Sequence, residues 1–372
     1  MSTKQGYRKL INHLQTWIFG MPESEYLLPM LELRFTPEEA EFLSQIPFLP
    51  HSVEQLSERL NLPINDLKSD LDDLARKGAV YRVEGRSAVR YALGDTLLMF
   101  YRTPGWPGVE DEWNRKISPL LNQYYIEALA ADVMGHHTQG LRTVPVNKTI
   151  NDPRQIIPYE DLLQIIDQVE YYSVTTCACR HRKNLDPAFG EKHCDHETVN
   201  CLHFDKLGHY IVQNGLGKEI TKDETLEILA KAADAGLVHG VSNTVEGVDT
   251  ICNCCASCCL YLESIVKMPE PVPRGQQQSS YIRTMDAEQC KACGRCVNRC
   301  PMKALDLEDK KVTFQPERCL GCGVCVHKCP TGASYLIYRG EEQDVPNKPR
   351  DLAYRLLKER GQDPLERFRQ NS

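Results

Sequence analysis

The spacing of apolar residues over residues 36–93 predicts three helices followed by a β-hairpin. Capping-box sequences begin at Thr36 and at Ser52, and apolar residues recur three or four positions apart after each. A third helix is predicted to end at Gly78 and to place four apolar side chains inward, namely Ile64, Leu67, Leu71 and Leu74. Two alternating segments, 80–83 and 89–93, then flank a short polar turn, which predicts the hairpin.

The order of these elements resembles a winged-helix domain, and the resemblance covers residues 36–93 only. Ten acidic and seven basic residues lie in this stretch, and the outward face of the would-be recognition helix carries Asp66, Asp70 and Asp73. Affinity for DNA comes largely from cationic contacts to phosphates, so this acidic face argues against nucleic-acid binding. We therefore expect this domain to dock a protein partner or a second copy of the chain.

The segments around this domain are predicted to be helical. Residues 1–35 carry a helical apolar pattern at Leu10, Ile11, Leu14 and Ile18. Residues 94–150 are expected to form a helical connector, with one or two helices between Trp113 and Met134 and a break near Pro119. Within it, His136 and His137 are adjacent and project in different directions from a helix, so an ordinary surface pair is favoured over a ligand pair.

Residues 151–268 are expected to form a central domain of mixed helices and strands. A helix is predicted from Pro158, a strand over residues 171–176, a helix from a third capping box at Thr221 to Gly236, and a strand over 237–239. Residues 269–280 are rich in Pro, Gln and Ser and predict a linker. The charged tail, 341–372, contains one short amphipathic pattern at Leu352, Leu356 and Leu357, which predicts a docking helix or packed arm.

Composition narrows the class of protein. The chain has 372 residues and a net charge of −7, which does not favour wrapping of nucleic acid or binding to an anionic membrane. No long apolar run predicts a membrane span, and no export leader is recognisable, so we expect a cytoplasmic protein with reduced thiols. The chain has 17 cysteines, and all of them follow residue 176, which predicts a metal-binding second half.

Eight of these cysteines form two consecutive C-x2-C-x2-C-x3-C-P runs between Cys290 and Pro330. These runs resemble the two-cluster bacterial-type ferredoxins, and the resemblance covers about residues 281–340. The fourth cysteine of each run lies too far along the chain for its own cube and is expected to ligate the other one. The predicted ligand sets are therefore Cys290, Cys293, Cys296 and Cys329 for one [4Fe-4S] cluster, and Cys319, Cys322, Cys325 and Cys300 for the second.

Other residues of these runs have predicted structural roles. Pro301 and Pro330 turn the chain away after each crossing ligand. Gly294, Gly321 and Gly323 are expected to let backbone amides approach the cluster sulfurs.

The other nine cysteines match no ferredoxin run, and they are too clustered to serve only as packing residues. They are Cys177, Cys179, Cys194, Cys201, Cys252, Cys254, Cys255, Cys258 and Cys259. In an extended C-x-C the side chains point the same way, so Cys177 and Cys179 are expected to share one metal. Each adjacent pair, 254–255 and 258–259, points two ways, which favours two sites over one. We expect one or two further iron–sulfur centres, tuned by Arg180, His181 and His203 or with one histidine as a ligand.

The middle region as a whole resembles bacterial iron–sulfur proteins of poorly defined role, in which similar cysteine segments precede a ferredoxin module. It also resembles, loosely, the cysteine-rich domains of heterodisulfide reductases, although the spacings of that motif do not match. No dinucleotide fingerprint, nucleophile elbow or phosphate-binding loop is present, so electrons are expected to come from a partner protein.

The sequence thus predicts a multidomain α+β protein with a winged-helix-like domain, a central cysteine-rich domain and a two-cluster ferredoxin-like module. The favoured function is an electron-transfer protein or a subunit of an anaerobic redox complex. One alternative is a redox- or oxygen-sensing winged-helix regulator. A second is an oxidoreductase with an active cluster or thiol site at Cys252–Cys259.

Overall fold

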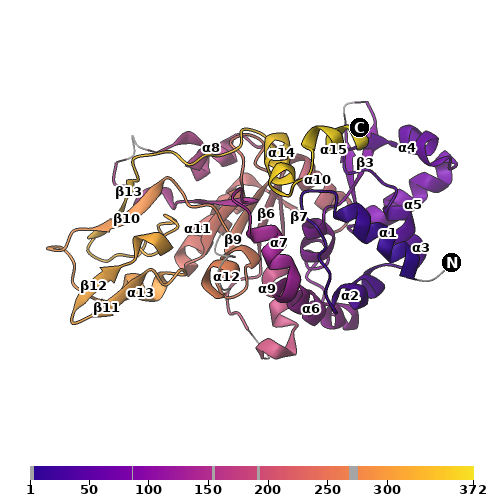
Figure 1. Cartoon of the computed structure of the whole chain (residues 1–372). Helices are drawn as coiled ribbons and strands as arrows, with labels where there is room; N and C mark the ends of the chain where they lie inside the picture. The colour runs from indigo at the N-terminus through magenta and orange to yellow at the C-terminus, as the bar shows by residue number, and fades with distance from the viewer. Residues whose placement is uncertain (1–3, 86, 153–155, 191–192, 268–274) are drawn as a thin grey trace.

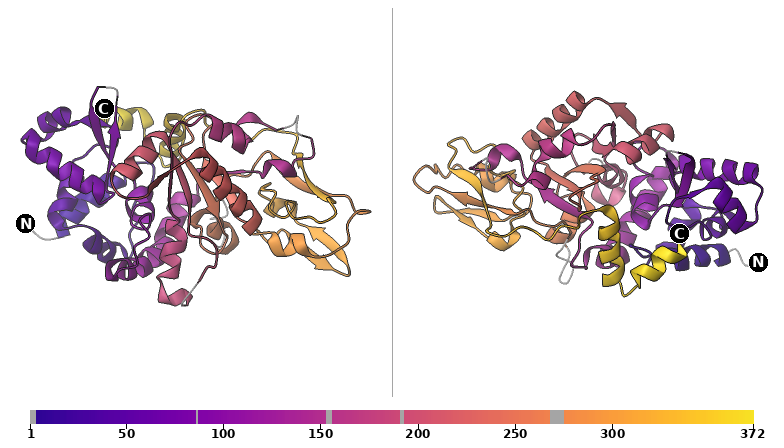
Figure 2. Two further views of the ribbon diagram at one scale, coloured as in Figure 1. Left: turned by 180° about the vertical axis from the view of Figure 1, so that it is seen from behind. Right: turned by 90° about the horizontal axis from the view of Figure 1, so that it is seen from above.

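A computed structural model describes residues 4–85, 87–152, 156–190, 193–267 and 275–372 of the chain. Helices and small sheets of the N-terminal part lie at one end of the molecule, and the C-terminal cysteine-rich module lies at the other (Figure 1). A six-stranded sheet with its helices lies between them, as the rotated views of Figure 2 also show. The central sheet is therefore flanked by both end parts.

The N-terminal part contains the predicted helices and hairpin. Its helices are α1 (Lys4–Leu14), α2 (Leu27–Arg34), α3 (Pro37–Leu43), α4 (Val53–Leu60) and α5 (Ile64–Arg76). Its strands are β1 (His51–Ser52), β2 (Val80–Glu84) and β3 (Val89–Leu93), in the order β1-β3-β2. The capping boxes at Thr36 and Ser52 both form, each satisfying two backbone amides that the helix leaves unpaired.

Two apolar residues of this part differ from their predicted placement. Ile64 is 44% exposed, because it is the first residue of α5 and precedes the face that Leu67, Leu71 and Leu74 bury. Ile18 lies beyond α1, which ends at Leu14. The remaining apolar positions lie in one continuous core that reaches from α1 to the central sheet.

The connector is helical only in part. It contains a π-helical turn, η1 (Leu97–Arg102), followed by α6 (Glu112–Tyr124), η2 (Tyr125–Leu129) and α7 (Ala130–Met134). The predicted break near Pro119 is wrong: α6 runs through it, because the buried face of Ile117 and Leu121 continues on both sides. The connector also supplies β4 (Leu141–Val144), an edge strand of the central sheet.

The central sheet is antiparallel throughout and has the strand order β4-β8-β9-β6-β5-β7. Its other strands are β5 (Tyr172–Thr176), β6 (Val199–Phe204), β7 (Lys218–Ile220), β8 (Val238–Ser242) and β9 (Thr250–Cys254). Its helices are α8 (Leu162–Asp167), α9 (Ala178–Asn184), α10 (Asp205–Gln213), α11 (Lys222–Ala235) and α12 (Leu260–Lys267), with short 3-10 turns η3 (Asn147–Thr149), η5 (Pro158–Glu160) and η6 (Pro187–Phe189). The third predicted capping box, at Thr221, forms at the start of α11.

The C-terminal module consists of two antiparallel ribbons joined by cysteine loops. One pairs β10 (Tyr281–Met285) with β13 (Ser334–Tyr338), and the other pairs β11 (Leu305–Glu308) with β12 (Lys311–Phe314). Two short helical segments, α13 (Arg295–Arg299) and η7 (Pro316–Arg318), lie within the loops. The pairing of β10 with β13 brings the two ends of the module together.

The predicted linker is packed where it is described. Residues 269–274 of that prediction lie outside the described residues, but 275–280 join the central sheet to the module. The backbone of Gln277 pairs with Leu141 and Thr143 of β4, and the Ser279 amide donates to the Leu320 carbonyl at 3.0 Å. The polar side chains that indicated a free linker instead make buried hydrogen bonds, such as Ser279 Oγ to the Gly321 carbonyl.

The tail crosses the molecule from the C-terminal module to the N-terminal part (Figure 1). It contains α14 (Pro349–Glu359) and α15 (Pro364–Gln370), and α14 buries Leu356 and Leu357. The carboxylate of Glu359 accepts from Thr138, and the side chain of Asn371 accepts from the Phe48 amide at 2.9 Å. The tail is therefore a packed arm in this structure.

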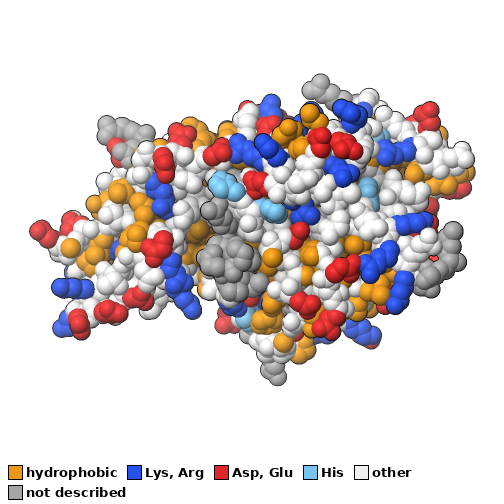
Figure 3. Space-filling view, in the orientation of Figure 1, with side chains coloured by type: hydrophobic (Ala, Val, Ile, Leu, Met, Phe, Trp, Pro, Cys, Tyr) orange, Lys and Arg blue, Asp and Glu red, His pale blue; other side chains and the backbone are white. Residues whose placement is uncertain are grey.

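The surface carries both signs of charge. On the face shown in Figure 3, Lys and Arg side chains are interspersed with Asp and Glu. Within the described part of the chain, every helix is too short or too polar to cross a membrane.

Candidate iron–sulfur sites

The outer ferredoxin site brings together the first three cysteines of one run and the last cysteine of the other. Cys290, Cys293, Cys296 and Cys329 line one pocket. Cys293 is exposed and the other three are partly buried, so this site lies close to solvent. Burial alone would raise the pKa of Cys329, but amide hydrogen bonds from Ser334 and Thr331 lower it, which favours a thiolate there.

The inner ferredoxin site brings Cys300 to the second run. Three of its thiols, Cys319, Cys322 and Cys325, are buried. Burial, together with the neighbouring thiols of Cys319 and Cys300, raises the pKa of Cys322 to about 12, although a hydrogen bond from the Val324 amide opposes the shift. Without a bound positive centre this thiol stays neutral, so the case for a cluster here depends on the convergence of the cysteines and not on their acidity.

Two of the predicted glycines also allow close packing of the cysteine loop. Gly321 and Gly323 both have positive φ, at 72° and 73°. A Cβ atom on Gly321 would lie 2.1 Å from the Tyr281 carbonyl oxygen, and one on Gly323 would lie 2.3 Å from the Thr149 hydroxyl. These glycines let the cysteine loop pack against β10 and the segment before β5.

Arg283 lies between the two ferredoxin sites. It is 4% exposed, and its charge lowers the pKa of both Cys296 and Cys325, against the larger effect of burial. Its Nε donates to Ser334 Oγ at 3.0 Å, while one terminal nitrogen has no hydrogen-bond partner. An unpaired buried guanidinium nitrogen beside thiols of both sites fits anionic groups there.

The comparison with known families agrees with this geometry. Residues 289–333 match the 4Fe-4S dicluster domain family. This segment is an iron–sulfur module. It resembles ferredoxins and binds at least one [4Fe-4S] cluster, which identifies electron transfer as its general role. No curated protein and no solved structure shows significant similarity to the chain.

Six of the nine remaining cysteines surround one buried space in the central part, which we call the six-thiol chamber. A cavity of about 50 Å³ is lined by Cys177, Cys179, Cys201, Cys252, Cys254 and Cys259. Cys255 and Cys258 also reach its wall. The chamber lies where β6, β9 and the starts of α9 and α12 meet.

Each thiol of the chamber interacts with one or two neighbouring thiols. A hydrogen bond with Cys177 lowers the pKa of Cys179, and Cys259 contributes in the same direction. Hydrogen bonds with Cys201 and then Cys254 lower the pKa of Cys252. Hydrogen bonds among these thiols thus favour the thiolate form at Cys179 and Cys252, and six sulfurs around one space are a donor set suited to a cluster.

Cys177 and Cys179 do not lie on an extended segment. The predicted geometry, in which both side chains point the same way from a strand, is therefore wrong. The strand β5 ends at Thr176, Cys177 is the N-cap residue of α9, and Cys179 is its second residue. A buried ion pair between Lys183 and Glu263, at 3.0 Å, ties α9 to α12. This contact brings Cys179 next to Cys259 from a separate helix.

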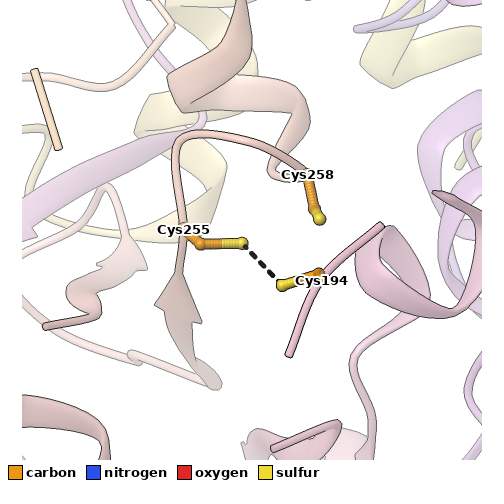
Figure 4. Close-up of side chains that lie close together, drawn as sticks. All are labelled: Cys194, Cys255 and Cys258. Atoms are coloured by element: carbon orange, nitrogen blue, oxygen red, sulfur yellow. Dashed lines mark hydrogen bonds between the residues drawn. The ribbon is translucent and has the colours of Figure 1, made fainter. Parts of the chain in front are cut away.

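The last three cysteines form a compact group of their own. Cys255 follows β9, Cys258 precedes α12 and Cys194 comes from the segment between η6 and β6; their thiols converge (Figure 4). The Sγ atoms of Cys194 and Cys255 lie 3.8 Å apart, and all three sulfurs lie within 4.8 Å of one another. We call this group the cysteine trio.

Arg180 lies against both groups of thiols. Its side chain is fully buried and donates to three oxygens, those of Glu197, Asn200 and Asn253. Burial alone would lower the pKa of Arg180, but the thiols of Cys177 and Cys255 raise it. It therefore supplies a permanent positive charge to anionic sulfur on either side.

The histidines named as candidates differ in the contacts of their ring nitrogens. His203 is fully buried, and its two ring nitrogens contact the Thr175 and Thr250 hydroxyls at 3.1 and 3.2 Å. Burial and the charge of Arg102 lower its pKa, so the ring is neutral. The His181 ring interacts with the Val109 backbone and the Glu110 carboxylate, and His137 lines a separate cavity that contains no cysteine.

Sequence reasoning did not identify Arg102 and Tyr261. Both line the chamber, and both also line a second cavity of about 280 Å³ beneath α14. Burial alone would lower the pKa of Arg102, but Tyr261, Cys252 and Asp95 raise it. Nothing in the local sequence indicates that Arg102 lies at a thiol site, because it belongs to a π-helical turn that is distant in sequence from every cysteine.

Proposed function

We propose that this protein relays single electrons from an external donor through two ferredoxin-type [4Fe-4S] clusters to a further iron–sulfur centre in the six-thiol chamber. The observation that carries this proposal is the order of the three thiol sets. They run from an exposed site, through a buried one, to a chamber enclosed within the central part of the chain.

The outer site offers the place of entry. Lys291 and Arg295 are exposed residues that line its pocket, and Cys293 is exposed beside them. A partner with an acidic surface would be attracted to this site and held close to its thiols. The buried Arg283 behind the pocket would favour the reduced state of a cluster by adding positive charge.

The inner site connects the module to the chamber. Cys322 and Val324 belong to the same continuous buried core as Cys254 and Cys259. Arg299 holds the two parts together, donating to the Val324 carbonyl and to the Asp234 and Ala233 carbonyls at the end of α11. These contacts hold the module in a fixed position against the central part, which suits transfer between centres.

The side chains of this chain position and insulate the centres, while the clusters supply the one-electron chemistry when bound. Lys328 and His327 both contact the Asp234 carboxylate at 2.6 Å and lower its pKa to about 2. This cluster of charges fixes the orientation of the module against α11. Lys328 and Arg299 are thus used in contacts within the chain, whereas Lys291, Arg295 and Lys303 are exposed and can face a partner.

An iron count tests the proposal directly. Three centres predict about twelve iron atoms per chain after anaerobic purification, four for each cube. The variant Cys254→Ser should lose the chamber's iron and retain the two ferredoxin signals in electron paramagnetic resonance. A wild-type count of eight or fewer would show that the chamber holds no cluster, and the relay would then end at the module.

The second cavity favours one alternative, an oxidoreductase whose site is the chamber itself. The cavity of about 280 Å³ shares Leu97, Arg102 and Tyr261 with the chamber, and it is large enough for a small molecule. Such a substrate would contact Arg102 and the carboxylates of Asp95 and Asp249 beside Cys252. Turnover of a small disulfide or thiol by the reduced protein, lost in Arg102→Met and kept in Arg295→Met, would support this alternative.

A further inference from the structure

The cysteine trio differs from the other thiol sets in how close its sulfurs lie. Within the described part of the chain, Cys194, Cys255 and Cys258 are the one group of three metal-binding side chains whose ligand atoms all lie within 4.8 Å of one another. The ferredoxin quartets do not form such a group, although they line cluster sites. The trio is therefore arranged for a smaller centre.

Elementary geometry identifies that centre. When thiolates are arranged tetrahedrally around one zinc ion, with each sulfur at about 2.3 Å from the metal, their sulfur atoms lie about 3.8 Å from one another. The Sγ atoms of Cys194 and Cys255 are 3.8 Å apart. A cube binds each thiolate at a different corner, so its ligands lie farther apart than those of a single ion.

The local sequence fits the same conclusion. Cys255-Ala256-Ser257-Cys258 is a C-x2-C knuckle, the spacing that zinc sites use to supply two ligands from one turn. Cys194 supplies the third ligand from a separate segment (Figure 4). The three residues are 6%, 7% and 0% exposed for Cys194, Cys255 and Cys258, so the site is enclosed as structural zinc sites are.

A fourth donor is close to the knuckle. The His193 Nε2 atom lies 3.0 Å from the Ser257 carbonyl oxygen, and the His193 ring contacts Phe189 with centroids 4.9 Å apart. Because Ser257 lies within the knuckle, His193 is the candidate for the fourth ligand of a Cys3His set, a common structural arrangement for zinc. Ser257 Oγ also lies 3.6 Å from the sulfurs of both Cys255 and Cys258.

We propose that Cys194, Cys255 and Cys258 form a mononuclear zinc site that adjoins the six-thiol chamber and is distinct from the iron–sulfur centres. The site clamps the segment between η6 and β6 to the turn between β9 and α12. The adjacent residues of that turn, Cys254 and Cys259, face the chamber, so the zinc ion fixes the orientation of two chamber thiols. The inference does not depend on the electron relay.

Metal analysis of the full-length protein tests this assignment. The protein would be produced with iron and zinc both present, purified anaerobically and dialysed against a chelator. We expect about one zinc atom per chain, and the zinc K-edge absorption spectrum should show three sulfur neighbours at about 2.3 Å. Absence of tightly held zinc, or zinc with only nitrogen and oxygen neighbours, would overturn the proposal.

Two matched variants separate this site from the chamber. Cys258→Ser should lose the zinc and keep the iron, whereas Cys252→Ser should lose iron and keep the zinc. Loss of the same amount of iron from both variants, with no change in zinc, would assign the trio to a cluster. If Cys258→Ser does not fold, the zinc-edge spectrum of the wild-type protein decides the question alone.

Discussion

Cys254 and Cys255 are neighbours in the chain, yet their thiols belong to different groups. Cys254 interacts with Cys252 and Cys259 in the chamber, whereas the Cys255 sulfur lies 3.8 Å from that of Cys194. The same division holds for Cys258 and Cys259. The six-residue segment 254–259 thus supplies thiols to two separate groups.

The first prediction concerns this division. Cys254→Ser should lower the iron content by about four atoms per chain, because it removes a chamber thiol. Cys255→Ser, one residue away and similarly buried, should leave the iron content unchanged. Both variants would be purified anaerobically and their iron measured by mass spectrometry. Equal iron losses in the two variants would contradict the division.

The second prediction concerns Arg283. Replacing this buried guanidinium with methionine removes a positive charge near both ferredoxin sites, so the reduction potentials of the module should become more negative. If the lost charge interaction is worth about 1.4 kcal/mol, the reduction potential shifts by about 60 mV for transfer of one electron. Redox titration followed by electron paramagnetic resonance measures the shift. Arg295→Met, an exposed residue of the same pocket, should shift the potentials less, because water screens its charge.

The third prediction concerns the junction of the module with α11. Arg299→Ala removes three hydrogen bonds to main-chain carbonyls, those of Val324, Asp234 and Ala233. Transfer of electrons from the module to the chamber should slow, while the iron content stays unchanged. Rapid-freeze electron paramagnetic resonance after mixing with a reductant follows the transfer. Lys303→Ala, an exposed control on the same module, should leave the rate unchanged.

Much of the local structure could be predicted from the sequence, since it depends on neighbouring residues. The three capping boxes, the hairpin and strands β5 and β8 follow from patterns a few residues long. The spacing of the cysteines in the two ferredoxin runs is enough to predict iron–sulfur ligation. These features need no knowledge of distant contacts.

The rest depended on contacts between distant residues. No local pattern marks Leu141–Val144 as a sheet edge, because its partners lie about a hundred residues away. The C-x-C segment was expected to be extended, but the helix that begins after Cys177 orients it. Arg102 reaches Cys252 only through the packing of η1 against α9.

The fourth prediction concerns nucleic acid. Asp66, Asp70 and Asp73 are exposed on α5, so their carboxylates would face the phosphates of a duplex docked there. We expect no salt-dependent binding of the purified protein to duplex DNA in fluorescence anisotropy. A variant with all three replaced by asparagine should gain weak, non-specific affinity. Tight binding by the wild-type protein would favour the redox-sensing regulator instead.

The last prediction concerns pH and the carboxyl group of Glu160. This side chain is 1% exposed and accepts from the amide and hydroxyl of Ser280, which joins the central part to the module. Burial raises its pKa from an ordinary value of 4.5 to about 7, although the Ser280 hydrogen bonds and Arg142 oppose this shift. The folded protein therefore keeps this group protonated at pH values where the unfolded chain has already ionised it.

The sign of the effect follows from this difference. Between about pH 4.5 and pH 7 the unfolded state binds fewer protons at Glu160 than the folded state does. The contribution of Glu160 to the free energy of unfolding therefore falls as the pH rises. The loss is roughly 3 kcal/mol, since each pKa unit corresponds to about 1.4 kcal/mol. Glu160→Gln cannot ionise, so its stability relative to the wild-type protein should increase from pH 5 to about pH 8.

Thermal unfolding under anaerobic conditions measures this difference at each pH. Comparison at equal pH removes the acid sensitivity of the metal centres, which both proteins share. Glu308→Gln provides the control, because Glu308 is an exposed carboxylate of the same module that does not contribute to the raised pKa of Glu160. Parallel pH profiles for the wild-type protein and Glu160→Gln would show that Glu160 is already ionised in the folded state, with Arg142 as its counter-ion.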